Sequence, residues 1–328
     1  MGADLGRRVR QAAAAGLLRG VPAGEVRVEP LGCGESYSAW LVQGAEQARV
    51  VRVARRPREE MPRPMEAELA ALERVPSHLG SRALGAEPDP DNPLGAPYMV
   101  VTHVPGRVMT PQDWSPQLGE QLAAQLVRLH RALADPPAPE ARTLTPVGRT
   151  AHETLAWWRA HHPGALADPL AAGLIDPWLE RVQVHDPAFV GTPLRGRVHG
   201  DVVVTNVIIG PDGVPRFIDF EWAEHEDPAK DLALIGGGIV GGPWYAPLSR
   251  DDVVALVAGY ARRLRRDCVP GEVADSDPER LLARRDAWEL LDRMGNLLYC
   301  LSRAEQGGYR RWAQSLSAGL SRALGAGA

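Results

Sequence analysis

Two carboxylates and one amide are spaced in a way that suits chemistry on a phosphate group. Asp201 is followed five residues later by Asn206, and Asp219 stands beyond the turn sequence Gly210-Pro-Asp-Gly213. Because such a turn joins two strands into a hairpin, we expect Asn206 and Asp219, at the two hairpin ends, to lie close together. An amide oxygen and a carboxylate suit Mg²⁺ that is also bound to phosphate oxygens. Asp201 is then available to orient or deprotonate a hydroxyl nucleophile.

An ordinary turn explains part of the same pattern. Taken alone, Asp201 could form an Asx turn and Asn206 could begin a strand, and short motifs of this kind often arise by chance. The acid beyond the hairpin and the segment Asp227-Pro-Ala-Lys-Asp231-Leu make the chemical interpretation the better one.

Four motifs in this part of the chain resemble those of a known family. They are His199-Gly-Asp201, Asn206, Ile218-Asp219-Phe-Glu221 and Asp227-Pro-Ala-Lys-Asp231-Leu. Together they resemble the aminoglycoside phosphotransferase (APH) family, to whose superfamily the choline kinases also belong. The resemblance extends from about Glu29 to at least Leu234 and is weaker toward the N-terminus. Relatives commonly have Leu-His-Pro-Gly between the aspartate and the asparagine, whereas this chain has Val202-Val-Val-Thr205, so the chemistry is better supported than any particular substrate.

The resemblance implies a protein-kinase-like fold and a role for each of these residues. Asp201 would be the catalytic aspartate, and Asn206 and Asp219 would bind Mg²⁺. His199 would be a structural member of the same loop. Asp231 would be a buried acid that supports the loop or caps the following helix, and an N-cap is a better interpretation of it than a reactant.

Hydrophobic periodicity predicts two parts of different structure. In the N-terminal part we expect a leading surface helix over 5–19, three antiparallel strands between Val26 and Val53, a helix from Glu66 to Val75 and a strand from Tyr98 to Val104. In the C-terminal part we expect helices over 118–133 and around 154–161, a strand pair within 206–220, and mainly helix from Asp251 onward. We therefore predict an α+β, bilobal, protein-kinase-like fold. Residues 1–103 would form an antiparallel-sheet lobe with one helix that binds nucleotide, and residues 104–328 a larger, mainly helical lobe that binds the acceptor.

The loop Leu31-Gly-Cys-Gly-Glu-Ser-Tyr37 joins the first two predicted strands. Glycines such as Gly32 and Gly34 let backbone N–H groups approach phosphates closely. The loop resembles the nucleotide-positioning loop of the family, with Ser36 near the terminal phosphates, although an ordinary hairpin would have a similar composition. We expect the adenine against backbone groups from Thr102 to Val104, with ATP or GTP as the phosphate donor.

A kinase-like site also needs a cation on its third strand, paired with a helix glutamate. The single lysine of the chain, Lys230, lies in the C-terminal motif. We therefore assign this place to Arg52 in the strand Val50-Val-Arg-Val-Ala54, with Glu68 as its expected partner and Glu66 as the alternative. Arginine stays charged and can bind a phosphate through two N–H groups. The other interpretation is an exposed strand arginine and a solvated helix acid.

Acidic side chains near the predicted loop suggest a cationic acceptor. Glu221 and Glu224 belong to an acidic cluster, and Glu289 and Asp292 stand three apart near Trp288. Carboxylates beside aromatic rings favour cations, although solvent-facing acids would give the same pattern. We predict a Mg²⁺-dependent O-phosphotransferase that transfers the γ-phosphate of a nucleoside triphosphate to a hydroxyl of a small molecule, such as an aminoglycoside-like antibiotic. The alternatives are a metabolite kinase for choline, a sugar amine or homoserine, and a non-catalytic nucleotide-binding regulator.

Composition limits the other classes of function. The 328 residues carry a net charge of -4, which does not favour a nucleic-acid or membrane-surface partner. Three cysteines, Cys33, Cys268 and Cys300, fit neither a disulfide framework nor a zinc site, and we expect a cytoplasmic protein. The sequence does not indicate an oligomeric state.

Two further motifs match functional patterns only formally. Gly236-Gly-Gly-Ile-Val-Gly241 has the spacing of a dinucleotide-binding fingerprint, but no strand–helix–strand unit surrounds it. We expect it to be a flexible loop at the rim of the acceptor site. His161-His162 has no neighbouring ligand set, and we expect it at a solvated helix end.

Overall fold

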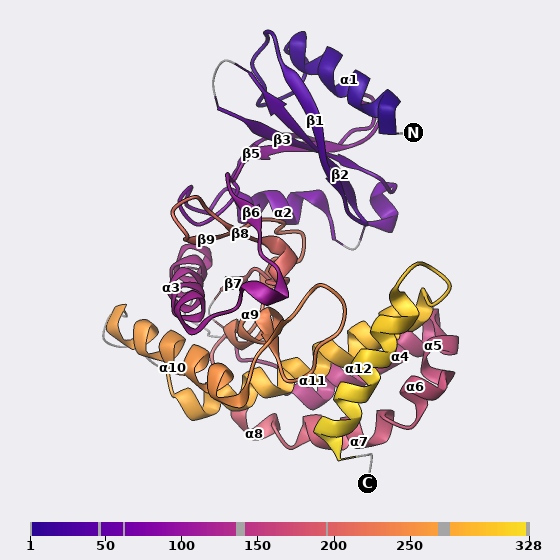
Figure 1. Cartoon of the computed structure of the whole chain (residues 1–328), viewed down its shortest axis with the longest axis vertical. Coiled ribbons are helices and arrows are strands. Elements are labelled where there is room, and N and C mark those ends of the chain that lie inside the picture. The colour runs from indigo at the N-terminus through magenta and orange to yellow at the C-terminus, as the bar shows by residue number, and fades with distance from the viewer. Residues whose placement is uncertain are drawn as a thin grey trace. The chain divides into compact units, whose positions relative to one another are not determined.

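The computed structural model describes residues 2–44, 47–61, 63–135, 142–194, 196–267 and 276–325 (Figure 1). The chain forms two compact units. The first unit contains residues 1–106, 210–212 and 216–223, and the second contains residues 107–209, 213–215 and 224–328. Cys268 and the proline-rich residues 136–141 lie outside the described residues. That one lobe binds the nucleotide and the other the acceptor stays a prediction.

The first unit is built around one antiparallel sheet with the strand order β1-β2-β3-β5-β4. Its strands are β1 (Arg27–Cys33), β2 (Tyr37–Gln43), β3 (Arg49–Ala54), β4 (Ala83–Glu87) and β5 (Tyr98–Thr102). The unit also contains helices α1 (Gly2–Ala14) and α2 (Met65–Leu72) and a 3₁₀ helix, η1 (Arg58–Glu60). The predicted strands and helices are present. β4 was not predicted, because it is short and glycine interrupts its apolar pattern.

Strand alternation divides the side chains of this sheet between two faces. One face forms a buried cluster with α1, which includes Val9, Val51, Val53, Tyr98 and Val100. The predicted surface helix therefore has one buried face, and it ends at Ala14. Arg52 stands between two valines of this cluster and so projects from the opposite face, where it contacts Tyr37 and Met99.

The second unit is mainly helical. Its helices are α3 (Pro116–Leu133), α4 (Val147–His161), α5 (Pro163–Ala167), α6 (Pro169–Ala172), α7 (Ile175–Gln183), α8 (Asp186–Phe189), α9 (Pro228–Ile235), α10 (Arg250–Asp267), α11 (Pro278–Ser302) and α12 (Tyr309–Leu324). Two 3₁₀ helices are η2 (Pro111–Asp113) and η3 (Val204–Asn206). Short strands are β6 (Arg107–Val108), β7 (Arg197–Val198), β8 (Val207–Ile209), β9 (Pro215–Phe217), β10 (Glu224–His225), β11 (Gly236–Gly237) and β12 (Ala246–Pro247), of which β9 ends in the first unit. The predicted helices and strand pair are present, and α4 begins earlier than expected.

α11 is the central helix of the second unit, and α9, α10 and α12 pack against it (Figure 1). Its start follows from the sequence, because Asp277 accepts a hydrogen bond from Glu279 N–H and Pro278 occupies the first helical position. α3 begins in the same way, with the Ser115 side chain as its cap. None of the helices within the described ranges is long and apolar enough to span a membrane.

Candidate functional site

The loop with Asp201 and Asn206 is held by its own hydrogen bonds. Asn206 Nδ2 donates to Asp201 Oδ2 at 2.7 Å and to the Asp201 carbonyl at 3.0 Å. His199 is fully buried, and its Nδ1 accepts from the Asp201 N–H at 3.3 Å. Gly200 has a φ of 81°, a backbone conformation that favours glycine. The side chains of Val202 to Val204 are buried, so apolar packing also holds this loop.

Asp231 supports this loop from α9. Its Oδ2 accepts from the His199 N–H at 2.9 Å, and its Oδ1 accepts from the Gly200 N–H at 2.8 Å. His130 Nε2 lies 2.8 Å from the same carboxylate, and its Nδ1 lies 2.7 Å from the Tyr260 hydroxyl. Burial alone would raise the pKa of Asp231, but the hydrogen bond from His130 and the loop N–H groups lower it.

The preferred interpretation of Asp231 as an N-cap is wrong. α9 begins at Pro228, and its N-cap is Asp227, whose Oδ1 accepts from the Ala229 N–H at 3.1 Å. Asp231 lies within the helix, where an N-cap residue cannot be. The hydrogen bonds of Asp231 support the loop and do not cap a helix.

Arg52 joins three side chains of the first unit. Its guanidinium forms an ion pair with Glu68 of α2 and a second one with Asp219 at 2.6 Å, and it stacks on the Tyr37 ring at 4.3 Å. Arg52 is 8% exposed, so it is not the exposed strand arginine of the alternative interpretation. Burial alone would lower the pKa of Arg52, but the charges of Asp219 and Glu68 raise it. Glu66, the alternative partner, pairs with Arg58 instead.

Asp219 has a strained backbone. Its φ of 66° is the only positive value of a non-glycine residue in the part of the chain that the structure describes. Such residues are uncommon outside glycine and gather at functional sites. In this conformation the Asp219 carboxylate forms an ion pair with Arg52. Its neighbours in the sequence, Phe217 and Phe220, have buried side chains.

Two further acids complete this cluster and leave it short of positive charge. Burial raises the pKa of Glu68 to about 7 against the opposing effect of Arg52, and Asp219 adds to the rise. Burial and Asp219 also raise the pKa of Glu221, which accepts a hydrogen bond from the Ser36 hydroxyl. Within the described residues, one carboxylate oxygen of Glu68 and one of Glu221 are buried without a hydrogen-bond partner. Glu68 and Asp219 therefore share the Arg52 guanidinium, and Glu221 lies close enough to feel its charge.

The glycine loop between β1 and β2 is open on one side. A Cβ atom at Gly32 would meet nothing within 4 Å, so a ligand could approach the backbone there. The Gly34 N–H donates to the Tyr37 carbonyl at 2.9 Å, and the Arg55 side chain donates to the Gly34 carbonyl. Gly34 therefore belongs to the turn itself, whereas Gly32 leaves free space.

Thr102 and Val104, at and just after the end of β5, differ in whether their backbone groups are already hydrogen-bonded. Thr102 exchanges hydrogen bonds with Arg82, through its N–H at 2.9 Å and its hydroxyl at 3.0 Å. The N–H and carbonyl of Val104 make no hydrogen bond with any described residue. Val104 is therefore the better candidate for a backbone contact to a base.

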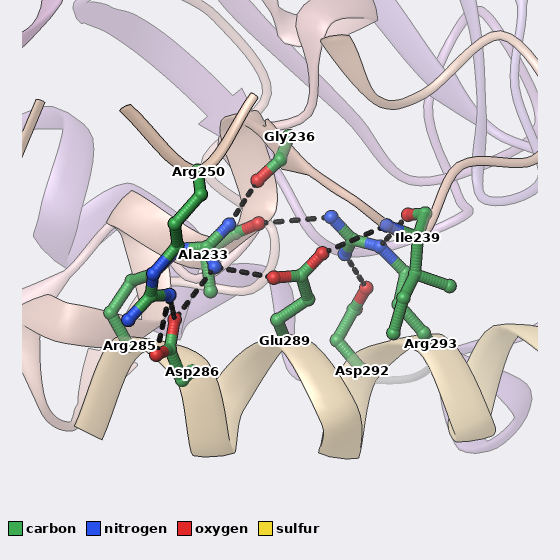
Figure 2. Close-up of polar contacts among 9 residues, drawn as sticks. All are labelled: Ala233, Gly236, Ile239, Arg250, Arg285, Asp286, Glu289, Asp292 and Arg293. Carbon is green, nitrogen blue, oxygen red and sulfur yellow. Dashed lines mark hydrogen bonds and ion pairs between the residues drawn. The ribbon is translucent and has the colours of Figure 1, made fainter. Parts of the chain in front are cut away.

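The four acids proposed for the acceptor do not form one cluster. Glu221 lies in the first unit beside Asp219, and Glu224 pairs with Lys230 at 2.6 Å. Glu289 pairs with Arg285 and accepts from the Ile239 N–H, as Figure 2 shows. Asp292 pairs with Arg293 and accepts from the Tyr245 hydroxyl. These acids already have protein partners and are not simply solvent-facing.

The glycine segment after α9 begins with a short strand, so its first two residues are not the loop that we expected. Gly236 and Gly237 form β11, which pairs in parallel with β12. A Cβ atom at Gly237 would collide with the Glu289 carboxylate. The glycines are present because α11 and β12 approach the backbone closely.

The fit to Mg²⁺ rests on few atoms. Among the described residues, no three His, Cys, Asp or Glu side chains gather closely enough to hold a metal ion by themselves. Asn206 Oδ1 has no hydrogen-bond partner among them, because the amide nitrogen makes both bonds to Asp201. Such an oxygen suits an ion that phosphate oxygens also bind. Asn206 and Asp219 belong to different units, and their convergence stays a prediction.

The family model that matches the chain is that of the phosphotransferase enzyme family, APH, over residues 27–271. The chain belongs to this family. No curated protein matches it significantly. The predicted family is therefore confirmed.

Solved structures similar to this family member share its fold. Aminoglycoside phosphotransferase APH(4)-Ia is 14% identical with a TM-score of 0.62, covering 98% of this chain and 99% of that one. A choline kinase from Cryptosporidium parvum Iowa II is 12% identical with a TM-score of 0.61, covering 90% and 88%. Choline kinase LicA from Streptococcus pneumoniae is 15% identical with a TM-score of 0.61, covering 96% and 99%. The predicted kinase-like α+β fold is confirmed.

Proposed function

We propose that the protein is a Mg²⁺-dependent small-molecule O-phosphotransferase, in which the γ-phosphate of ATP or GTP passes to a hydroxyl group. The observation that carries the proposal is the Asp201–Asn206 pair, in which the amide nitrogen of Asn206 is bonded to Asp201 and its amide oxygen has no partner among the described residues. Structures of APH(4)-Ia contain ADP or AMP-PNP together with hygromycin B, which supports a nucleotide donor and a hydroxyl-bearing small molecule here.

In this proposal the first unit binds the nucleotide. Backbone groups near Gly32 and Gly34 approach the phosphates, and Val104, with Thr102 beside it, contacts the base. Arg52 binds phosphate oxygens while Glu68 holds the guanidinium in place. Ser36 acts through Glu221, to which its hydroxyl is bonded.

Asn206 and Asp219 would hold Mg²⁺, which neutralises charge on the phosphate oxygens when it is bound. Asp201 orients the acceptor hydroxyl and takes its proton as the new oxygen–phosphorus bond forms. The bond between the β- and γ-phosphates breaks, and the nucleoside diphosphate leaves. Asp231 and His199 keep the backbone of this loop in position.

A row of aromatic rings supports a cationic acceptor, either an aminoglycoside or a metabolite such as choline. Trp244 lies 5.0 Å from Trp312, which lies 5.0 Å from Tyr309, and Tyr309 lies 5.8 Å from Tyr299. All four are half-buried, and Trp244 is hydrogen-bonded through its carbonyl to the Asp201 loop. Aromatic faces attract ammonium groups, and both candidate acceptor classes carry them.

The test is ADP or GDP formation with a panel of acceptors, namely aminoglycosides, choline, sugar amines and homoserine. Asp201→Asn should lower kcat by about 10² to 10⁴ because proton transfer is lost, while nucleotide binding persists. Asp212→Asn is the matched control, because Asp212 is exposed on the hairpin turn. Normal turnover in Asp201→Asn would sink the assignment. Nucleotide binding without phosphate release on any acceptor would favour the non-catalytic regulator.

A further inference from the structure

A fully buried arginine of α11 binds several segments at once. Arg293 Nε donates to the Ile239 carbonyl at 2.9 Å, and its Nη2 donates to the Ala233 carbonyl at 3.0 Å. Its Nη1 forms an ion pair with Asp292, and Figure 2 shows all three contacts. The guanidinium also stacks on the Tyr245 ring at 3.3 Å. Arg293 thus connects α11 to α9, to the glycine segment and to the chain before β12.

The first connection leads to the Asp201 loop through α9. Ala233 lies two residues after Asp231 in this helix. Asp231 accepts the N–H groups of His199 and Gly200. A shift of α9 would therefore move the beginning of the loop.

The second connection leads to the other end of the same loop. The Tyr245 hydroxyl donates to Asp292 Oδ2 at 2.7 Å and accepts from Asn296. The preceding carbonyl, that of Trp244, accepts from the Val204 N–H at 2.9 Å. Tyr245 is 1% exposed, so its ring fixes the backbone that reaches Val204.

These contacts close a ring of named bonds from Arg293 through α9 to His199, and from Val204 through Tyr245 back to Arg293. We propose that Arg293 is a positioning residue, which holds the loop bearing Asp201 and Asn206 at both of its ends. Asp292, which was predicted to bind the acceptor, is the ion-pair partner of Arg293 in this ring of contacts. The inference rests on the proposed function for its effect on turnover, but not for its effect on the loop.

Arginine is suited to this role by its shape. The planar guanidinium offers five N–H donors in fixed directions, and its face can stack on an aromatic ring at the same time. A lysine would keep the charge, but its three donors start from one atom and cannot reach two carbonyls and a carboxylate with good geometry.

Arg285 provides a matched comparison on the same helix. It is also fully buried, and it pairs with Glu289 and donates to the Gly236 carbonyl. The structure gives it no bond to Ala233 or to Tyr245. Arg285→Lys therefore removes a buried guanidinium without opening the ring of contacts.

The experiment measures amide hydrogen exchange over residues 199–206 in the full-length protein, together with kcat and the KM for nucleotide. In Arg293→Lys, exchange at His199, Gly200 and Val204 should rise about tenfold, as expected for a local opening. The value of kcat should fall about tenfold, with the KM for nucleotide within about twofold, because the nucleotide contacts are untouched. Arg285→Lys should leave exchange and kcat near those of the wild type.

A second variant covers the case in which Arg293→Lys does not fold. Tyr245→Phe keeps the ring under the guanidinium but removes the bonds to Asp292 and Asn296, and it should raise exchange at Val204 but not at Gly200. Equal exchange in the two arginine variants, or unchanged exchange at Val204 in Tyr245→Phe, overturns the proposal. Faster exchange in Arg293→Lys alone, with kcat unchanged, also overturns the proposal. If the wild type transfers no phosphate, the proposed function fails and the exchange data alone decide.

Discussion

The acids of the two units have different partners. In the first unit, Glu68 and Asp219 share one cation, Arg52, whose charge also acts on the nearby Glu221. In the second unit, each acid has its own set of donors. Asp227 accepts from Arg284, from the Trp288 indole and from the start of α9, and Asp231 accepts from two loop N–H groups and a histidine.

This difference distinguishes acids that stabilise the fold from acids that could bind a ligand. A buried carboxylate with three donors gains nothing from a further cation, whereas a group of three acids around one guanidinium does. Proton uptake and cation binding are both ways to complete the first group. The second group is complete without either.

The largest effect, on the free energy of unfolding, should come from removing Asp227, whose carboxylate is fully hydrogen-bonded. Asp227→Ala leaves the guanidinium of Arg284 buried without its partner and removes the cap of α9. The free energy of unfolding should fall by about 3 to 5 kcal/mol, the usual cost of stranding a buried charge. Urea unfolding measures it. Glu305→Ala, at an exposed position, is the control and should change the value by less than about 0.5 kcal/mol. A loss no greater than that of the control would contradict the comparison.

The next effect should come from removing the shared cation. Arg52→Met takes away the positive charge among the three acids of the first unit. The Kd for ADP with Mg²⁺ should rise by about 10- to 100-fold, since charged hydrogen bonds contribute about 1.5 to 3 kcal/mol. Titration calorimetry measures it. Arg27→Met, an exposed change in the same sheet, should bind ADP normally. Wild-type affinity in Arg52→Met would show that the acids do not form a nucleotide site.

The smallest effect should appear in the pH dependence of stability. The pKa of Glu68 is raised to about 7 in the folded state from 4.5, so the folded state holds this proton more firmly. Its contribution to stability is present below pH 4.5 and is lost as the pH rises through 7. The wild type should therefore lose stability relative to Glu68→Gln over this window, by at most about 1.4 kcal/mol per pH unit.

The contribution of Asp231 to stability should depend on pH in the opposite direction. Its pKa is lowered in the folded state, so its contribution is present at neutral pH and is lost as the pH falls through the folded value. Urea unfolding of wild type and Glu68→Gln between pH 4 and 8 tests the sign. A difference that does not change with pH would mean that Glu68 has an ordinary pKa.

Features that depend on neighbours in the sequence could be predicted. Strand alternation placed Arg52 and Val53 on opposite faces, and the pair of Arg52 with Glu68 followed from one strand and one helix. The hydrogen bonds between Asp201 and Asn206 also join near neighbours. In these cases the spacing of the residues along a strand, a helix or a short loop determines which side chains can meet.

Features that depend on distant packing could not be predicted. The carboxylate of Asp231 is held by His130, about a hundred residues earlier, and nothing near Asp231 in the sequence signals this. Glu289 and Asp292 have charged partners nearby in the sequence, but their contacts with Ile239 and Tyr245 join positions that are distant along the chain. The glycines after α9 resembled a flexible loop because the side chain that excludes a Cβ atom there belongs to α11.

The collision that a side chain at Gly237 would make with Glu289 also has a consequence for evolution. The two positions are about fifty residues apart, but neither can change its volume alone. A homologue with alanine at the first position would need a rearranged or shorter side chain at the second, or a displaced α11. Positions 237 and 289 should therefore covary among relatives.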